Sequence, residues 1–448
     1  MPVRSSNVEP RAAPMGATRV PFGDALRFWT KLGFINFGGP TAQIAILHEE
    51  VVERRRWISE DRFLHALNFC MLLPGPEAQQ LATYIGWLLH GTIGGIAAGT
   101  LFVLPSMFIL FALSAIYAAY GSVPWIANIF QGVQPAVVAI VAAALLRISR
   151  RALRHPVHVA LAAAAFLSLF TFHVPFPMVI AAALAIGFWG SRWRPDIFTA
   201  SAHKATPGAA TSEPESDFED DAREAPPTAA RFLNMLAVFL LLWLVPFAAL
   251  WMWRGPQDVL MREAIFFTQA ALITFGGAYA VLPYVAQQAV QHFGWLTPAD
   301  MIVGLGLAET TPGPLIMVLQ FVGFFAGWNQ ARDLGWAGAA AGALTATYFT
   351  FLPCFAFIFL FAPWMERIRR ISVLSGALSA VTAAVVGVML NLALWFAAQV
   401  FSTETGPDIP AILFSAIAFV GVWRWSWSIP LVLLAAIAFS MATKTVFQ

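Results

Sequence analysis

The chain has 448 residues, of which 59% are hydrophobic and only 11% are charged, and its formal net charge is +2. Because a soluble domain carries about 25% charged residues, this composition excludes an ordinary soluble protein and indicates an all-α polytopic membrane protein. A net charge so close to zero also argues against a nucleic-acid partner, which selects strongly basic surfaces.

The first half of the chain alternates broken and continuous apolar segments. Residues 1–22 contain arginines but no apolar run of the kind that a cleavable secretory signal needs, so we expect a tail that stays in the cytoplasm. Two apolar segments follow, at 26–49 and 63–90, and each has glycine and proline near its middle. The run at 92–117 is uninterrupted and exceeds the ~20 residues that cross the hydrocarbon of a bilayer, so it predicts a full crossing.

A polar linker and one isolated apolar run separate the two halves. Residues 191–231 are rich in Pro, Ala, Ser and acidic residues and contain few large apolar groups, which predicts a disordered cytoplasmic linker. Residues 232–253 are almost entirely apolar and predict a transmembrane helix that connects the halves. On these boundaries the first repeat covers 23–190 and the second covers 258–448.

The second half repeats the first. The stretch "FINFGGPTAQIAIL" from Phe34 matches "LITFGGAYAVLPYV" from Leu272. The same offset of 238 residues separates three pairs of landmarks, namely Gly38 and Gly276, Trp57 and Trp295, and Pro74 and Pro312. A constant offset at three separate places indicates a fused duplication.

The charged loops predict that the two repeats are inserted with opposite orientation. The loop "HEEVVERRRW" of the first half has three arginines, whereas its partner "AQQAVQHFGW" has none. In the next pair of loops the second half is the basic one, because "AAYGSVPW" lacks charge and "APWMERIRRIS" has three arginines. In the third pair the first half is again basic, since "RISRRALRH" is rich in arginine and "FSTETGPDIP" has no Lys or Arg. Since Lys and Arg in short loops mark the cytoplasmic side, this alternation is typical of the inverted repeats of secondary transporters.

Each half contains two segments with a helix breaker near the middle. The second-half segments are 264–285 and 299–327, and the four breakers are Gly38-Gly39-Pro40, Pro74-Gly75-Pro76, Gly276-Gly277 and Pro312-Gly313-Pro314. Proline removes a backbone donor and ends a helix, so each segment predicts a pair of half-helices. We expect re-entrant hairpins, with kinked crossings as the alternative, and about four full crossings besides them in each half.

These breaks predict an anion site between the halves. Irregular backbone at membrane depth is tolerated where it is buried in protein or lines an aqueous cavity. Half-helices that begin after Pro76 and Pro314 would direct free amide groups and the positive ends of their dipoles at that place. The alternative is that the kinks only permit close packing of helices.

The sequence resembles the chromate ion transporter (CHR) family, in its long-chain form with two domains. The resemblance rests on "FINFGGPTAQIAIL", on "LLPGPEAQQLATYIGWLLHGTIGGIAAGTLFVLPS" and on "GLAETTPGPLIMVLQFVGFFAG". It implies a multi-pass protein of the cell inner membrane that exports chromate, coupled to the proton-motive force, and thereby confers chromate resistance. The residues alone indicate a duplicated transporter for an anion, whereas chromate comes from the resemblance.

Three ionisable residues are candidates for the transport chemistry, because charges inside the membrane are costly. Lys31 is the preferred cationic contact for an oxyanion, and the alternative is a lysine that reaches the cytoplasmic interface. Glu77 and Glu309 are candidates for proton coupling, since a bound dianion repels two ionised carboxylates. Glu77 directly follows Pro76, so a helix-capping role is its alternative.

The remaining residues of the predicted substrate site are the helix breakers and neutral polar groups beside them. They are Asn36, Gly38, Gly39, Pro74, Gly75, Pro76, Gln79, Gly276, Gly277, Thr310, Thr311, Pro312, Gly313 and Pro314, with Thr41, Gln43, Gln80 and Gln320 as further hydrogen-bond donors.

The sequence gives no indication of a disulfide, a metal or cofactor site, or an enzyme active site. Cys70 and Cys354 lie in apolar segments of different halves, so we expect neither a disulfide nor a metal site, and no cofactor. The chain has no HExxH or GxSxG motif, so an intramembrane enzyme is not expected. A sulfate or other oxyanion transporter and a passive anion channel remain alternatives, and the sequence leaves the choice between monomer and homodimer open.

Overall fold

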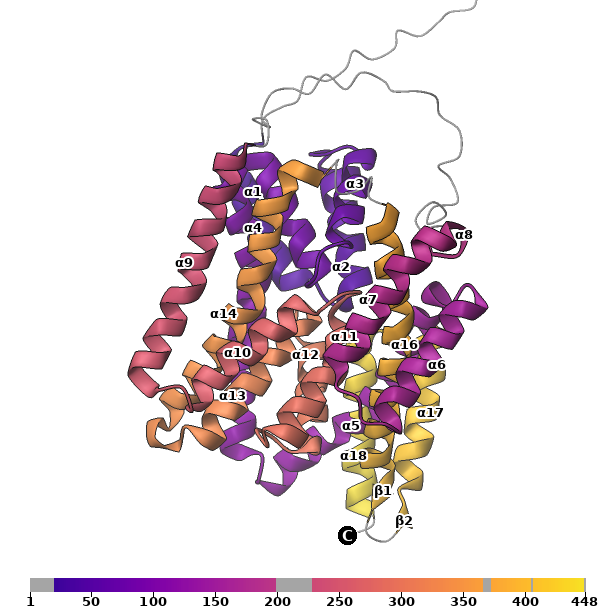
Figure 1. Cartoon of the computed structure of the whole chain (residues 1–448). Coiled ribbons are helices and arrows are strands. Elements are labelled where there is room, and N and C mark those ends of the chain that lie inside the picture. The colour runs from indigo at the N-terminus through magenta and orange to yellow at the C-terminus, as the bar shows by residue number, and fades with distance from the viewer. Residues whose placement is uncertain (1–19, 199–227, 366–371, 404–405, 447–448) are drawn as a thin grey trace, which may run out of the picture.

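The computed structural model describes residues 20–198, 228–365, 372–403 and 406–446, and almost all of them are helical (Figure 1). In these ranges the only strands are β1 (Ser402–Thr403) and β2 (Gly406–Pro407), which form one antiparallel hairpin. Most of the tail predicted at 1–22, the linker at 199–227 and the basic loop at 366–371 lie outside the described residues.

The first half is an unbroken series of helices joined by short turns. They are α1 (Phe22–Ile35), α2 (Gly39–His48), the π-helical turn η1 (Glu49–Arg54), α3 (Glu60–Cys70), α4 (Glu77–Tyr120), α5 (Pro124–Ala152), α6 (Pro156–Phe170), α7 (Phe176–Trp193) and the short α8 (Pro195–Phe198). Non-helical backbone at His90 and Gly91 divides α4 into two parts, just before the crossing predicted at 92–117.

The connecting helix α9 (Ala229–Arg254) leads to the second half. Its elements are α10 (Val259–Leu272), α11 (Ala278–Ala286), the π-helical turn η2 (Gln287–His292), α12 (Pro298–Thr310), the 3-10 turn η3 (Leu315–Met317), α13 (Val318–Gln330), η4 (Arg332–Leu334), α14 (Trp336–Phe361), η5 (Ala362–Trp364), α16 (Ser372–Phe401), α17 (Ile409–Arg424) and α18 (Ile429–Val446).

Six helices among the described residues are long and apolar enough to cross a membrane. They are Glu77–Tyr120, Pro124–Ala152, Phe176–Trp193, Ala229–Arg254, Trp336–Trp364 and Leu374–Phe401. Together with the shorter apolar helices, they confirm a helical protein that passes the membrane several times. The connecting helix α9 has no buried residue and lies along the left edge of Figure 1. This exposure is typical of a helix whose apolar side chains face lipid.

The duplication is visible in the positions of the secondary structure. The π-helical turns η1 and η2 begin 238 residues apart, as do α3 and α12, and as do α4 and η3. The N-caps of α3 and α12 also correspond, because Ser59 accepts a hydrogen bond from the Arg62 amide and Thr297 accepts one from the Asp300 amide. The sequence repeat is therefore a structural repeat.

Helices of the two halves pack against one another rather than forming separate bodies. The first-half helix α5 contacts α12, α16, α17 and α18 of the second half, and α14 contacts α4. Close packing depends on small residues, as at Gly187 of α7, where an added Cβ would lie 2.7 Å from the Cα of Ala377 in α16. Any site between the halves is therefore held by helices of both repeats.

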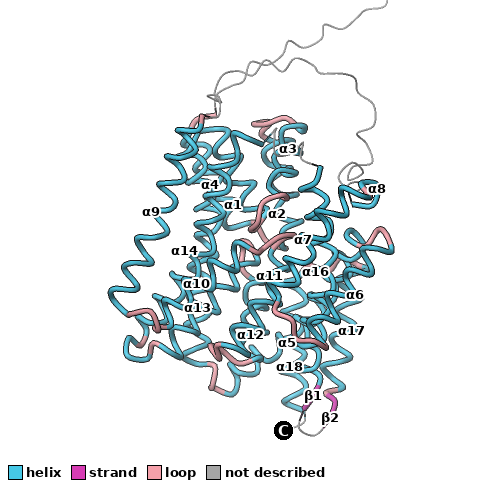
Figure 2. Tube along the Cα trace, viewed as in Figure 1, coloured by secondary structure: helices cyan, strands magenta, loops and turns pink. Residues whose placement is uncertain are grey.

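Each of the four predicted breaks contains non-helical backbone, although Gly39 and Pro40 are already the first residues of α2. Two of the breaks are buried loops. Residues 73–76 separate α3 from α4 and residues 311–314 separate α12 from η3, and all of these are buried. Figure 2 shows loop backbone at mid-height in the bundle, near α2 and α11, as well as at its two ends. The half-helices begin at Glu77 and Leu315, directly after the predicted prolines.

The helical structure extends further into the linker than the composition predicts. The composition predicts a linker from residue 191, but α7 continues to Trp193 and α8 covers Pro195–Phe198. The reason is a tertiary contact, because the ring of Phe198 is buried against Gly190 of α7. At its other end, α9 begins at Ala229, three residues before the predicted start of the connecting helix.

Candidate functional site

The two halves are joined at their breaks by a reciprocal pair of backbone hydrogen bonds. The amide of Gly75 donates to the carbonyl of Thr274 at 2.8 Å, and the amide of Gly313 donates to the carbonyl of Asn36 at 3.2 Å. Asn36 and Thr274 occupy the same repeat position, as do Gly75 and Gly313. Each Pro-Gly-Pro loop is therefore bonded to the end of the first helix in the opposite half.

The same reciprocity holds for the residues that cover these glycines. A Cβ on Gly313 would lie 2.5 Å from the Cβ of Ser106, and one on Gly75 would lie 2.9 Å from Sγ of Cys354. Both glycines also have positive φ angles, +126° at Gly75 and +119° at Gly313, which side chains rarely adopt. Glycine is thus required at both positions by backbone conformation and by the contact with the other half.

Buried amide side chains of the first half surround these loops. The Gln43 Nε2 atom donates to the carbonyls of Asn36 and Gly313, at 3.0 and 2.6 Å, and Gln80 Nε2 donates to the Pro74 carbonyl at 2.7 Å. The side-chain oxygens of Asn36, Gln43, Gln79 and Gln80 and the hydroxyl of Ser106 are buried without a partner among the described residues. Unpaired buried polar atoms require water or a ligand, so this cluster has spare hydrogen-bonding capacity.

The carboxylate of Glu77 faces the break of the opposite half. A Cβ on Gly277 would lie 3.8 Å from Glu77 Oε1, and the Glu77 side chain is half-buried. No side chain caps the start of α4, and within the described ranges Glu77 has no hydrogen bond or ion pair. The capping hydrogen bond considered from the sequence is therefore not formed, although the carboxylate still lies at the positive end of the helix dipole.

Glu309 lies near the end of α12 and has a specific partner. The hydroxyl of Tyr279, at the start of α11, donates to Glu309 Oε1 at 2.5 Å, and Glu309 is only 5% exposed. The contact links the two breaks of the second half, because Tyr279 follows Gly277 and Glu309 precedes Pro312. Each half thus places one carboxylate beside a break.

The other predicted residues divide into two groups. Gly38, Gly39, Gly276 and Gly277 all have positive φ angles at the starts of α2 and α11. The hydroxyls of Thr310 and Thr311 donate to carbonyls of their own helix, and Gln320 donates to the Met107 carbonyl of α4 at 2.8 Å. The threonine hydroxyls and the Gln320 amide are already engaged within the protein in this conformation.

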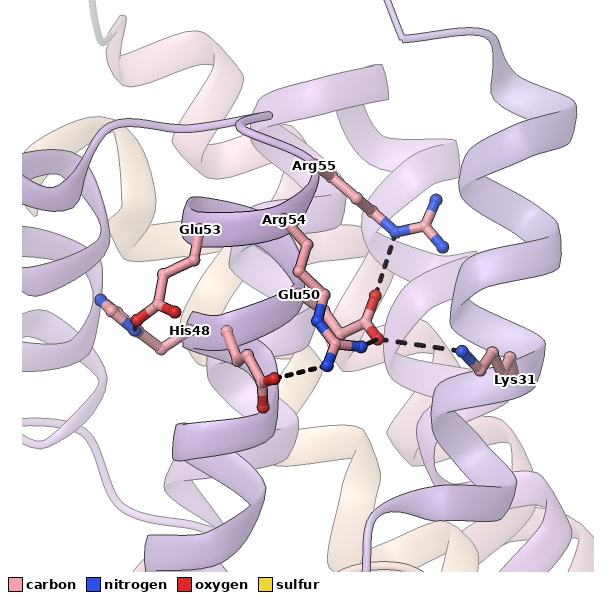
Figure 3. A network of polar contacts seen from close by, with 7 residues as sticks. Lys31, His48, Glu50, Glu53, Arg54 and Arg55 are labelled. Atoms are coloured by element: carbon pink, nitrogen blue, oxygen red, sulfur yellow. Dashed lines mark hydrogen bonds and ion pairs between the residues drawn. The ribbon is translucent and has the colours of Figure 1, made fainter.

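Lys31 belongs to a different group of contacts, shown in Figure 3. Its Nζ lies 3.8 Å from Glu50 Oε1, and its side chain is 57% exposed. Glu50, which is 6% exposed, also pairs with Arg54 at 3.2 Å and with Arg55 at 3.3 Å. Three cations therefore share one buried carboxylate near the start of α3, and a substrate contact for Lys31 stays a prediction.

Several residues of this region were missed by sequence reasoning. Tyr279, Thr274 and Ser106 were overlooked because a single hydroxyl in an apolar run carries no distinctive signal. The repeat itself could have identified Ser106, since Leu104-Pro105-Ser106 corresponds to Leu352-Pro353-Cys354. Glu263, a carboxylate inside α10, was missed although its apolar surroundings were visible in the sequence.

Removing the Tyr279 hydroxyl is expected to destabilise the protein. Tyr279→Phe leaves a buried carboxyl without its donor, and a hydrogen bond to a charged group contributes about 1.5–3 kcal/mol. Thermal unfolding in detergent should therefore shift to a lower temperature. Tyr284→Phe, on the same helix, is the matched control because its hydroxyl has no hydrogen bond among the described residues. Equal melting temperatures for the two variants would contradict a structural role for the Tyr279 bond.

Comparisons with known proteins agree with the resemblance found in the motifs. A family model described as chromate transporter matches residues 23–188 and 262–441. The chain is 31% identical to a chromate transport protein of Pseudomonas aeruginosa over 416 residues, which are 91% of this chain and 88% of that protein. It is 28% identical to a probable chromate transport protein of Synechococcus elongatus over 421 residues, covering 92% and 93% of the two chains.

A third relative extends the range of organisms. A chromate transport protein of Cupriavidus metallidurans is 25% identical over 397 residues, which are 87% of this chain and 85% of that protein. No solved structure matches the chain significantly. Because the family model matches in both halves and these relatives align over most of the sequence, the chain belongs to the chromate transporter family.

Proposed function

We propose that this protein is a secondary transporter that exports chromate across the inner membrane, coupled to the proton-motive force, and so confers chromate resistance. Family membership supports transport, and the names of three relatives support chromate as the substrate. The main support for a substrate site between the halves is the pair of backbone hydrogen bonds that Gly75 and Gly313 each donate to the opposite repeat.

Inverted orientation of the repeats is part of this proposal. In Figure 1, α1 and α3 lie toward the upper end, whereas their repeat partners α10 and α12 lie lower. Arg54 of η1 and the two arginines that follow it precede α3, and Arg194 precedes α8, which also lies at the upper end. The positive-inside rule then makes the upper end cytoplasmic, with the N-terminus on that side.

The substrate site is proposed to be a cluster of amides and hydroxyls rather than a pocket of cations. The starts of α4 and η3 contribute helix dipoles. The unpaired hydroxyl of Ser106 can donate, and the side-chain amides of Asn36 and Gln79 each have one N–H group beyond the single bond that each amide nitrogen donates, to the Phe102 carbonyl and to the Thr83 hydroxyl. A tetrahedral dianion needs such donors from several directions. The same donors suit sulfate, which is also a tetrahedral dianion.

Proton coupling is proposed to involve Glu77 and Glu309. Both lie beside breaks that bond across the repeat interface, so a movement of one half against the other changes the surroundings of both carboxylates. A dianion bound between them is repelled while they are ionised. Protonation of at least one of them therefore accompanies anion binding in this proposal.

Uptake of labelled chromate into everted vesicles tests the assignment of the substrate and of Lys31. A hydrogen bond to a charged group is worth about 1.5–3 kcal/mol, so if Lys31 donates to the bound anion, Lys31→Ala should raise the KM for chromate roughly tenfold or more. Sulfate is added as a competitor to measure selectivity. Arg27→Ala, one turn earlier on α1 and 88% exposed, is the matched control and should leave the KM unchanged.

An unchanged KM in Lys31→Ala would remove Lys31 from the site and leave it in the ion-pair group around Glu50. Uptake of sulfate at the same rate as chromate, with mutual competition, would replace chromate transport by general oxyanion transport.

A further inference from the structure

A carboxyl group that plays no part in the proposed substrate site is buried in α10. Glu263 is the fifth residue of this helix, and its side chain is 0% exposed. Its neighbour Arg262 points outward and donates to Gln257 Oε1 at 3.2 Å, so it does not neutralise Glu263. The repeat position in the first half is Ala25, so the first half has no corresponding acid.

Both carboxyl oxygens of Glu263 lack a hydrogen-bond partner, and the residue forms no ion pair with any described residue. The group lies where α10 meets α14, because a Cβ on Gly342 would be 3.0 Å from Glu263 Oε1. Gly342 in turn packs against Gly323 of α13. The carboxyl therefore lies in a tightly packed contact of three helices, formed where glycines leave room for it.

Among the titratable groups on the neighbouring helices, Arg231 lies at the end of α9 away from α10, and the others are engaged elsewhere or neutral. Helix α13 has none, and the others are Arg231 and Arg254 at the two ends of α9, Tyr279 and Tyr284 on α11, and Tyr348 and Cys354 on α14. Tyr279 donates to Glu309, Tyr348 to the Leu242 carbonyl, and Cys354 to the Thr350 carbonyl. None of these groups compensates a negative charge on Glu263.

A cluster of charged residues lies around Asp258, the N-cap of α10, which precedes Glu263 by five residues. Arg254 Nε pairs with Asp258 at 2.9 Å, and its terminal nitrogens donate to Asp333 at 2.6 and 2.9 Å. These hydrogen bonds hold the pKa of Asp333 below its ordinary value of 3.8, so Arg254 remains paired at neutral pH. In Figure 1 this turn between α9 and α10 lies at the lower end, opposite α3 and α8.

We propose that Glu263 is a proton-binding site additional to Glu77 and Glu309, that it carries a proton in this conformation, and that protons reach it from the end of the molecule where α10 begins. A buried carboxylate without a partner is costly, whereas the neutral acid is tolerated, so the oxygens of Glu263 bind a proton here. Release of that proton requires α10, α13 and α14 to separate, which couples it to movement of the second half. This inference rests on the proposed proton-coupled transport, and it identifies the end of the molecule from which a coupled proton enters.

Infrared spectroscopy of the purified protein tests the proton directly. Wild type at neutral pH should show the C=O stretching band of a buried carboxylic acid, and Glu263→Gln, which keeps the size of the side chain, should lose that band. Glu309→Gln serves as a second variant that separates the contributions of the two acids. A wild-type band that persists in Glu263→Gln, or the absence of any such band, would overturn the proposal.

Transport by the same variant tests the coupling. In proteoliposomes, loss of one coupled proton lowers the accumulation ratio of chromate about tenfold for each pH unit of the imposed gradient, so the ratio of driven accumulation to chromate exchange should fall in Glu263→Gln. Glu53→Gln, an exposed carboxylate at 61%, is the control. Loss of the band with undiminished driven accumulation would contradict a role in coupling. If wild type carries no chromate, the proposed function fails, whereas the band and its loss still support the proton site.

Discussion

Gly313→Ala is expected to abolish chromate transport. The substitution forces a side chain onto backbone with a φ of +119°, which costs about 1–3 kcal/mol. It also drives the new methyl group to 2.5 Å from the Cβ of Ser106, and overpacking of this kind costs about 1–3 kcal/mol. Because Gly313 donates to the Asn36 carbonyl of the other half, both effects act on the contact between the repeats. Chromate uptake into everted vesicles measures the loss.

Two further variants separate strain from crowding at Gly313. Gly406→Ala introduces alanine at a φ of +126° with no atom within 4 Å of the new Cβ, far from the breaks, and should retain transport. Adding Ser106→Gly to Gly313→Ala removes the crowding but not the strain, and should restore part of the activity. Full activity in Gly313→Ala alone would contradict the requirement for a close contact between the halves.

Glu309→Gln is expected to uncouple transport from the pH gradient. The amide oxygen can still accept the Tyr279 hydrogen bond, so the substitution removes the titratable proton with little change in shape. Each proton lost from the coupling stoichiometry lowers the accumulation ratio of chromate about tenfold for each pH unit. The measurement is the steady-state ratio of chromate inside and outside proteoliposomes at several imposed gradients.

The control for this variant is Glu60→Gln, at a carboxylate that is 54% exposed at the start of α3. It should show the wild-type dependence on the gradient. Glu77→Gln, measured alongside, shows whether the carboxylate of the first half carries a proton as well. A slope of accumulation against pH gradient in Glu309→Gln equal to that of wild type would exclude Glu309 from coupling.

The helical membrane architecture and the duplication could be predicted, because long apolar segments and internal repeats are visible in the amino-acid sequence. The constant offset of 238 residues identifies the repeat in the amino-acid sequence itself, and η1 and η2 reproduce that offset in π-helical turns that no sequence rule anticipates. Proline and glycine act locally, so the breaks after Ile35, Cys70, Leu272 and Thr310 follow from the residue types at those positions.

The partners across the repeats could not be predicted, because they depend on tertiary contacts. The hydrogen bond from Gly75 to Thr274 spans almost two hundred residues, and nothing around Thr274 marks it as an acceptor. Lys31 is a candidate because of its sequence distance from Gly38, but helix α1 directs it toward Glu50 of the π-helical turn. The isolation of Glu263 depends on which helices cover α10, and the sequence around it does not specify them.

Chromate accumulation by the purified protein in proteoliposomes is the most direct test of proton-coupled export through these two halves. With an imposed pH gradient and labelled chromate at equal concentration on both sides, wild type should move chromate uphill until the gradient is dissipated by a protonophore. Chromate flux that only equalises the two concentrations, at a rate independent of the gradient, would contradict coupled transport and identify a passive anion channel.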